Sequence, residues 1–485
     1  MERSKAVHTA VSLLLLIFSV SGCHGATRPH VIFIVADDLG WNDVSWHNPQ
    51  IISPNLDRLA RNGVILNSSY VQPNCSPSRS CFMSGKYPYH TGFQNGIIPH
   101  LSPRGMPLSV TTLPQKLKEV GYSTHMVGKW HLGFCNWKYV PTFRGFDSFL
   151  GYYGGAEDYY THTSGPGYDF RLNDKFYTFL NDKVYTFPRG SYSTNVFGQR
   201  AVDIINNHNP ATPLFLYLPF QAVHAPLQVP KKYENMYAHI HNYKRRVFSG
   251  MVTAMDEAVG NITRALESTG LMENSVIIFT TDNGGPIVGG ANNFPLRGEK
   301  KTLWEGGTKG SAFVYSKNFM KKTHYTNTEM IHAVDWFPTI LHLAGGTPDP
   351  TIDGVNQWAT VSEGAPSARN EFVYNINDIE HNAAIRVGKY KLIKGSAGRY
   401  NGWYRPPTKH SDLKMDTFQY NYRLYDIEAD PTEHFDLASQ LPQVVSMMRD
   451  RLENYRKSMV PAGDLPDDPA GNPKNFGGVW SPGWC

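Results

Sequence analysis

Acidic and amide side chains follow two apolar segments of the chain. Asp37 and Asp38 come directly after the β-branched run at residues 30–36, and Asp282 and Asn283 come directly after a second such run. The carboxyl ends of parallel strands meet at one edge of a sheet, where sites form. Two acidic strand ends placed side by side repel each other strongly unless a cation lies between them.

Together these side chains offer three carboxylates and one amide oxygen. An all-oxygen set suits a hard cation such as Ca²⁺ or Mg²⁺, and the absence of a neighbouring His or Cys argues against zinc. The alternative is that each pair caps a helix or a turn. That alternative is stronger for one pair alone, whereas two pairs at strand ends favour a metal site.

The segment Cys75-Ser76-Pro77-Ser78-Arg79 has the composition of a helix start. A proline two residues after Cys75 suits the first helical turn. Backbone N–H groups and the helix dipole favour an anion there, and Arg79 lies one turn along. On composition alone, an ordinary helix start with a buried thiol is a strong alternative.

Three further segments carry cationic or titratable side chains. Lys129 and His131 stand two residues apart, so they share a face if the segment is extended, which suits anion binding and proton transfer. His224 follows a third apolar run, and Lys300 lies in a glycine-flanked loop. Taken singly each is weak evidence, because such a histidine is more often structural and such a lysine is usually solvated.

The elements that must position these side chains alternate between strands and helices. Apolar runs at residues 30–36, 213–219 and 275–280 predict buried strands of a parallel sheet. Helical patterns at residues 113–120 and 247–266 lie between them. This order predicts an α/β sheet covered by helices on both faces.

Residues 151–190 are rich in Gly, Tyr, Asp and Phe and repeat a short motif, at 173–179 and again at 181–187. Two short strands with an Asn-Asp turn would explain the repeat. The segment is interpreted as an insertion, either at the mouth of a site or as a surface hairpin.

A different pattern begins after about Asp353. Residues 383–394 alternate as one half-buried strand, with which residues 422–427 are expected to pair, and residues 443–460 show one apolar helix face. These elements predict a smaller α+β domain. The tail after Pro461 is rich in Pro, Gly and Asp and is expected to be extended.

Composition and charge narrow the class of protein. The 485 residues include 46 basic and 41 acidic ones, with a formal net charge of +5. This length allows two or three domains of roughly 150 residues. No Lys/Arg run is long enough for a nucleic-acid footprint, so no nucleic-acid partner is expected. A mildly basic surface favours polyanionic substrates only weakly.

The first 25 residues have the layout of a secretory signal peptide. Arg3 and Lys5 precede an apolar run at residues 11–20, and small residues follow it. The run is short for a membrane anchor, and no later stretch is long and apolar enough, so no transmembrane segment is expected. A bacterial lipoprotein site ending at Cys23 is a minor alternative. Sequons at Asn67 and Asn261 are candidate glycosylation sites of a secretory route.

Five cysteines are few for an exported protein. Cys23 is expected to leave with the signal peptide or to lie beside the cut. If Cys75 is chemically special, Cys81, Cys135 and Cys485 remain, so at most one intramolecular bridge forms and its pairing stays open.

Together these segments resemble the type I, formylglycine-dependent sulfatase family, most closely its arylsulfatase B-like members. Residues 75–79 match the Cys-x-Pro-Ser-Arg signature at which a formylglycine-generating enzyme oxidises the cysteine. Further blocks match in the family's order, at residues 35–40, 128–133, 281–285 and 292–307. The resemblance extends from about Arg28 to about Trp480.

The resemblance implies an alkaline-phosphatase-like fold, with a mixed, mainly parallel sheet flanked by helices in a catalytic domain at residues 27–360. A smaller C-terminal α+β domain would occupy residues 361–485. It also implies a metal, usually Ca²⁺ with Mg²⁺ possible, whose ligands are Asp37, Asp38, modified Cys75, Asp282 and Asn283.

Residue 75 would act as a formylglycine (3-oxoalanine) hydrate, the nucleophile, supported by Arg79 and His131. The sulfate would be held by Lys129, His224 and Lys300, and the last two are able to protonate the leaving oxygen. Asn74 also begins a sequon, but its side chain would abut this site, so glycosylation there is not expected.

The implied function is hydrolysis of aryl sulfates or of sulfated sugars such as N-acetylgalactosamine 4-sulfate, in a lysosome or outside the cell. Two departures concern maturation and cross-linking: Ser84-Gly85 replaces the usual Thr-Gly, and Cys81 and Cys135 do not match the arylsulfatase B cysteines. One alternative is a phosphate or phosphonate ester hydrolase of the same superfamily. A catalytically silent secreted binding protein is the other, and the intact set of polar residues argues against it.

Overall fold

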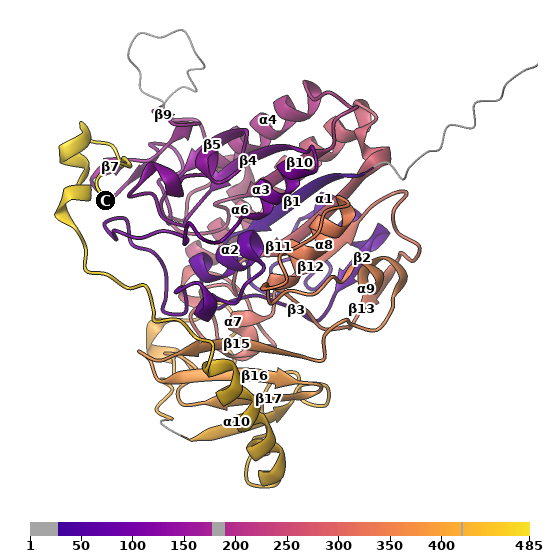
Figure 1. Cartoon of the computed structure of the whole chain (residues 1–485), viewed down its shortest axis with the longest axis vertical. Coiled ribbons are helices and arrows are strands. Elements are labelled where there is room, and N and C mark those ends of the chain that lie inside the picture. The colour runs from indigo at the N-terminus through magenta and orange to yellow at the C-terminus, as the bar shows by residue number, and fades with distance from the viewer. Residues whose placement is uncertain (1–27, 177–189, 419–420) are drawn as a thin grey trace, which may run out of the picture.

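The computed structural model describes residues 28–176, 190–418 and 421–485 (Figure 1). The expected signal peptide at residues 1–25 and the second copy of the repeated motif at 181–187 lie outside the described residues. In the described part of the chain, no helix has the length and apolar character needed to cross a membrane.

A ten-stranded sheet forms the larger part of the molecule. From edge to edge its strands are β13 (Tyr325–Asn327), β2 (Val64–Leu66), β12 (Ala312–Tyr315), β11 (Ser275–Thr281), β1 (His30–Ala36), β10 (Leu214–Pro219), β4 (Ser123–Lys129), β5 (Ser148–Tyr152), β8 (Arg171–Leu172) and β9 (Lys175–Phe176). The central strands from β11 to β5 run parallel, and antiparallel pairs flank them. The predicted mixed, mainly parallel sheet is confirmed.

Helices cover both faces of this sheet, as the sequence predicts. Alternate residues of β1 face two separate cores, because side chains of a strand point to opposite faces: Phe33 packs with one core and Ile34 with the other. The first core is covered by α2 (Cys75–Ser84), α3 (Leu113–Glu119) and α8 (Trp336–Leu343), and the second by α1 (Pro54–Asn62), α4 (Ser193–Asn206) and α6 (Tyr243–Ser268).

Several short elements complete the larger part. The β8–β9 hairpin turns through Asn173 and Asp174, with Asn173 in the left-handed region (φ 58°). The predicted pairing of the two copies of the repeated motif stays a prediction, because the second copy lies outside the described residues. The remaining elements are β3 (Ser69–Tyr70), paired with β14 (Ile331–His332), β6 (Thr163–Ser164), paired with β7 (Gly167–Tyr168), and the helices α5 (Lys231–Asn235), α7 (Glu305–Thr308) and α9 (Trp358–Glu363).

A small antiparallel sheet lies below the large one in Figure 1. Its strands are β15 (Glu371–Asn377), β16 (Asn382–Val387), β17 (Tyr390–Lys394) and β18 (Tyr422–Asp426), with α10 (Pro442–Arg456) packed against it. The prediction of one strand over residues 383–394 was wrong. Gly388, with φ 54°, and Lys389 form a two-residue turn that folds the segment into a hairpin, and only β17 pairs with β18.

After α10 the chain returns to the larger part of the molecule as a segment that we call the C-terminal strap (residues 461–485; yellow in Figure 1). The strap is irregular, with 3₁₀ turns at Pro469–Gly471 and Pro473–Phe476, and is not extended throughout as predicted. Backbone hydrogen bonds fasten it at Gly463 N to Gly92 O (2.9 Å) and at Trp480 N to Tyr168 O (2.9 Å). The one expected bridge is Cys135–Cys485 at the end of the strap, and Cys81 is a buried free thiol.

Candidate active site

The two acidic strand ends lie side by side. β1 and β11 are parallel neighbours with Ala36 opposite Thr281, so Asp37 and Asp282 leave the sheet together. The backbone N–H of Asp38 donates to Oδ1 of Asp282 at 3.3 Å. Burial, and the charge of Asp37, raise the pKa of Asp282 to about 6. Burial is the larger cause, and the repulsion between neighbouring carboxylates that the sequence anticipates adds to it.

Cys75 is the first residue of α2 and points at the same strand ends. Its Sγ donates to Oδ1 of Asp37 at 3.5 Å. Possible ligand atoms of Asp37, Asp38, Cys75 and His224 all lie within 4.8 Å of one another. Asn283 is buried there, and its Oδ1 has no hydrogen-bond partner in the described part of the chain. Oxygen atoms are the ligands that a hard cation prefers. A buried amide oxygen without a hydrogen bond is free to be one of them.

Arg79 fixes the start of α2 to two strands. Its Nε and Nη2 donate to Oδ2 of Asp282 at 3.0 and 2.8 Å, and its Nη1 donates to the carbonyl of Lys129 at 2.9 Å. The guanidinium and both partners are fully buried. The carboxylate that the resemblance assigns to the metal is therefore shared with this arginine.

Both site lysines form ion pairs with strand-end carboxylates. Lys129 Nζ lies 2.5 Å from Oδ2 of Asp37, and Lys300 Nζ lies 2.6 Å from Oδ1 of Asp38. Burial alone would raise the pKa of Asp37, but the neighbouring cations, chiefly Lys129, hold it below its ordinary value. Both carboxylates and both ammonium groups are thus gathered at one buried point.

The Cys75 thiol is not a thiolate in this setting. Burial, with the charges of Asp282 and Asp37, raises the pKa of Cys75 to about 12. A cysteine nucleophile needs the opposite shift, because only the thiolate attacks. The position suits chemistry at residue 75 that does not use a sulfur anion.

His131 supports the helix start through one intermediate residue. Its Nε2–H donates to the carbonyl of Ile98 at 3.2 Å, and the Ile98 N–H donates to Oγ of Ser76 at 3.2 Å. Burial, together with the charge of Lys129, lowers the pKa of His131 well below its ordinary value. Gly155 allows this packing, since a Cβ there would lie 2.9 Å from the ring.

His224 and Lys300 form the open side of the site, with side chains 21% and 11% exposed. His224 Nε2 lies 3.6 Å from Oδ2 of Asp38. The Nδ1–H of His224 donates to the Ala225 carbonyl at 2.6 Å. The backbone carbonyl of His224 accepts a hydrogen bond from the Tyr159 hydroxyl at 2.9 Å. Burial lowers the pKa of His224, and Asp38 offsets only part of this effect.

The candidate catalytic, sulfate-binding and metal-ligating residues thus converge on one place, although their separate patterns were weak. The sequence did not single out Tyr159, which belongs to the Tyr-rich segment at 151–190 and offered only its composition as a signal. It also missed Ser78, whose hydroxyl hydrogen-bonds to the Asp282 carbonyl and joins α2 to the end of β11. The first part of the Tyr-rich segment lies at the site, whereas the β8–β9 hairpin continues the sheet edge.

This geometry defines a class of protein: a hydrolase with an alkaline-phosphatase-like α/β fold, whose buried carboxylates and cations surround a residue at a helix start and can hold a metal beside an anionic ester. A model of the Sulfatase family matches residues 29–346, and the chain belongs to that family. It is a sulfatase, an enzyme that hydrolyses sulfate esters.

Similar proteins agree with this assignment. Arylsulfatase J from Mus musculus is 43% identical over 95% of this chain and 81% of its own length. N-acetylgalactosamine-6-sulfatase from Mus musculus is 29% identical over 94% of this chain and 92% of its own length. A solved structure of Ps i-CgsB in complex with k-i-k-neocarrahexaose superposes with a TM-score of 0.77 at 26% identity, covering 91% of this chain and 95% of that one.

Proposed function

We propose that this sulfatase uses residue 75 as its nucleophile after Cys75 has been oxidised to formylglycine by a formylglycine-generating enzyme. The observation that carries the proposal is the position of Cys75: a neutral, buried thiol at the start of α2, beside Asp37 and within the Cys-x-Pro-Ser-Arg signature. Hydrated, the aldehyde would supply a nucleophilic oxygen that the thiol lacks.

A calcium ion is proposed at the strand ends, held by Asp37, Asp38, residue 75, Asp282 and Asn283. The oxygen donors and the unpaired Oδ1 of Asn283 support this donor set. When bound, the cation would act as a Lewis acid toward the reacting group. His224 lies close enough to compete as a ligand, but an imidazole suits a hard cation poorly.

The chain's own cations are proposed to bind the sulfate. Lys129 and Lys300 donate to the carboxylates that would ligate the cation, so their Nζ atoms are the donors able to turn to a sulfate oxygen. Arg79 is tied to Asp282 on one side and to a backbone carbonyl on the other, so it orients the helix start.

Proton transfer is assigned to the open side of the site. Hydrolysis consumes one water, breaks the ester S–O bond and releases sulfate and an alcohol, whose oxygen needs a proton. His224 and Lys300 are the partly exposed groups that could deliver it.

A sulfated sugar is the proposed substrate, N-acetylgalactosamine sulfate being one example, since a similar enzyme carries that sugar in its name. The secretory route, ending in the lysosome or outside the cell, is part of the proposal. Asn261 is exposed on α6 and Asn67 half-buried in the turn after β2, so both suit N-glycans better than Asn74, which is the N-cap of α2 beside Cys75.

The test compares sulfate and phosphate esters of one aryl alcohol. Cys75→Ala should lower kcat/KM for the sulfate ester by roughly 10³-fold or more. Cys81→Ala is the matched control, because Cys81 is the other buried thiol of the same helix; it should keep most of the activity. Equal activity of the Cys75→Ala protein and the wild type would overturn the proposal.

A further inference from the structure

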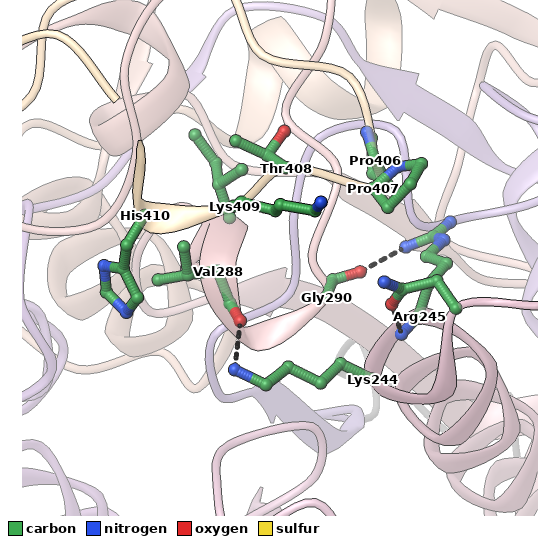
Figure 2. A pocket seen from close by; sticks show the side chains of 11 residues that line it. Lys244, Arg245, Val288, Gly290, Pro406, Pro407, Thr408, Lys409 and His410 are labelled. Carbon is green, nitrogen blue, oxygen red and sulfur yellow. Dashed lines mark hydrogen bonds between the residues drawn. The ribbon is translucent and has the colours of Figure 1, made fainter. Parts of the chain in front are cut away.

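A recess lies beside the start of α6 (Figure 2). It encloses about 250 Å³ between the first turn of α6, the 3₁₀ turn at Ile287–Gly289 and residues 406–410. Figure 2 shows the Lys409 side chain extending from the 406–410 segment into the recess, with Lys244 on the opposite side. We call this recess the basic pocket.

The charges of the basic pocket have one sign. Lys244, Lys409 and His410 line it and are exposed, and none of its described lining residues is acidic. Within residues 28–176, 190–418 and 421–485, Lys244 Nζ donates only to a backbone carbonyl, that of Val288, at 3.0 Å. Among the described residues, Lys409 has no ion pair. The pocket therefore concentrates positive charge that the protein itself does not neutralise.

Two nearby charges do not alter this sign. Arg245 also lines the pocket, but its guanidinium is paired with the buried carboxylate of Asp43, so it adds no free charge. Asp412 accepts a hydrogen bond from the Lys409 backbone N–H at 2.8 Å, but it does not line the pocket.

The basic pocket is joined to the active site through one loop. The backbone N–H of Ile287 donates to Oε2 of Glu299 at 2.7 Å, and Glu299 is the residue before Lys300. On the other wall, the exposed Arg405 guanidinium lies over the ring of Phe294, 3.8 Å from its centroid. The Ile287 wall of the pocket therefore touches the residue that precedes Lys300, so the pocket and Lys300 lie close together.

We propose that the basic pocket binds a second anionic group, a sulfate or a carboxylate, of a polyanionic glycan whose sulfate ester lies at residue 75. The inference rests on the proposed function and extends it from a single sulfated sugar to a chain with repeated negative charges. Asn242 and Thr408 offer polar groups to sugar hydroxyls, and Pro406 and Pro407 form an apolar wall. No Phe, Tyr or Trp is among the described lining residues on which a nucleobase could stack.

The test measures binding and turnover separately. Binding of a chondroitin sulfate tetrasaccharide is measured on full-length Cys75→Ala protein, which should not hydrolyse it. The same measurement is made on this protein after Lys244→Ala and Lys409→Ala, the pair of substitutions that we call the pocket variant, have been added. The pocket variant should bind about tenfold more weakly at low salt, and its affinity should depend less on salt concentration. A charge-matched control, Lys457→Ala/Lys474→Ala, removes two exposed lysines outside the pocket.

Turnover is measured with residue 75 intact. The pocket variant should lose more kcat/KM on the tetrasaccharide than on a monosulfated aryl ester. Equal losses on both substrates, or equal tetrasaccharide affinity in the pocket and control variants, would overturn the inference. Weakening of inorganic sulfate binding to the same extent would show a site for a free anion and would also overturn it. Failure of the intact enzyme to hydrolyse any sulfate ester would instead contradict the proposed function. The two failures can be told apart, because the binding measurement does not depend on turnover.

Discussion

At the scale of single residues, Asp37 and Asp38 are each paired with a lysine that is also expected to bind the substrate. Lys129 and Lys300 neutralise Asp37 and Asp38, yet both are the residues expected to hold the substrate. The sequence could predict this set, because the polar residues follow apolar strands directly. It could not predict the pairing, since which lysine meets which aspartate depends on how distant loops pack.

His224 can be tested through the leaving group. His224→Ala should lower kcat by roughly 10²-fold or more for sugar sulfates, whose alcohols are poor leaving groups, and by much less for activated aryl sulfates that need no proton. Steady-state kinetics on both substrate types gives the comparison, with His239→Ala, an exposed histidine, as the control. Equal losses on the two substrate types would remove the acid role of His224.

The metal assignment predicts a calcium-dependent melting temperature. Adding Ca²⁺ to protein stripped with a chelator should raise Tm by about 2 °C or more, because a ligand that binds only the folded state stabilises it. Asp38→Asn should abolish this rise while keeping a side chain that tolerates the left-handed backbone at this position (φ 62°).

Asp57→Asn, an exchange of a peripheral aspartate, should leave the calcium response intact and serves as the control. An undiminished calcium response in the Asp38→Asn protein would mean that the cation binds elsewhere.

At the scale of elements, the small sheet holds the loop that carries Lys300. Arg297, three residues before Lys300, lies over the rings of Trp304 and Trp403. Its Nη1 donates to the hydroxyl of Tyr425 on β18 at 3.2 Å. The small sheet thereby contributes to the active site without supplying a residue that we place in it.

A buried charge cluster joins the same two parts of the molecule. Lys391 of β17 lies 2.9 Å from Glu305 of α7 and 2.8 Å from Glu433, and all three side chains are fully buried. Lys391→Met would leave Glu305 without its ammonium partner and should lower the free energy of unfolding by roughly 3–5 kcal/mol. Glu433→Gln keeps an acceptor for the Glu305 N–H and should cost no more than about 1 kcal/mol. Urea unfolding of both variants tests the order, and the reverse order would contradict it.

The pH dependence of this cluster has a defined sign. Burial raises the pKa of Glu433 from its ordinary 4.5 to about 7. A raised pKa in the folded state gives stability that is present below pH 4.5 and lost as the pH rises through 7. Gln mimics the protonated acid, so the stability of Glu433→Gln relative to the wild type should increase between pH 5 and pH 8 in the same unfolding experiments. A relative stability that decreases over this range would contradict the assigned shift.

The sequence predicted these elements unevenly. The buried strands of the large sheet were clear, because long apolar runs of β-branched residues have few alternatives. The hairpin at residues 383–394 was missed because the alternation continues across Gly388, and only its backbone conformation reveals the turn. The ion cluster that joins the two parts has no local pattern at all.

At the scale of the whole molecule, the C-terminal strap brings the end of the chain back to the larger part of the molecule. Its bridge joins Cys135 and Cys485, 350 residues apart in the sequence. Counting cysteines limited the protein to one bridge, but the pairing needed the path of the strap, which a Pro/Gly-rich segment does not encode locally.

Removing this bridge tests the importance of the strap. Cys485→Ser should lower the free energy of unfolding by roughly 2–5 kcal/mol, because the bridge restricts the unfolded chain. Chemical unfolding under non-reducing conditions measures the change, and Cys81→Ala, which removes an unpaired thiol, is the control. An unchanged stability of the Cys485→Ser protein would mean that the backbone hydrogen bonds alone hold the strap.

The central claim, that residue 75 is oxidised, is tested most directly by peptide mass. Trypsin should release residues 62–79, between Arg61 and Arg79, from the active protein. N-glycans must be removed first, because the same peptide contains the sequon at Asn67. The account predicts an aldehyde, reactive toward hydrazides, in place of the Cys75 thiol. A fully active preparation in which this peptide carries only an unmodified cysteine would contradict it.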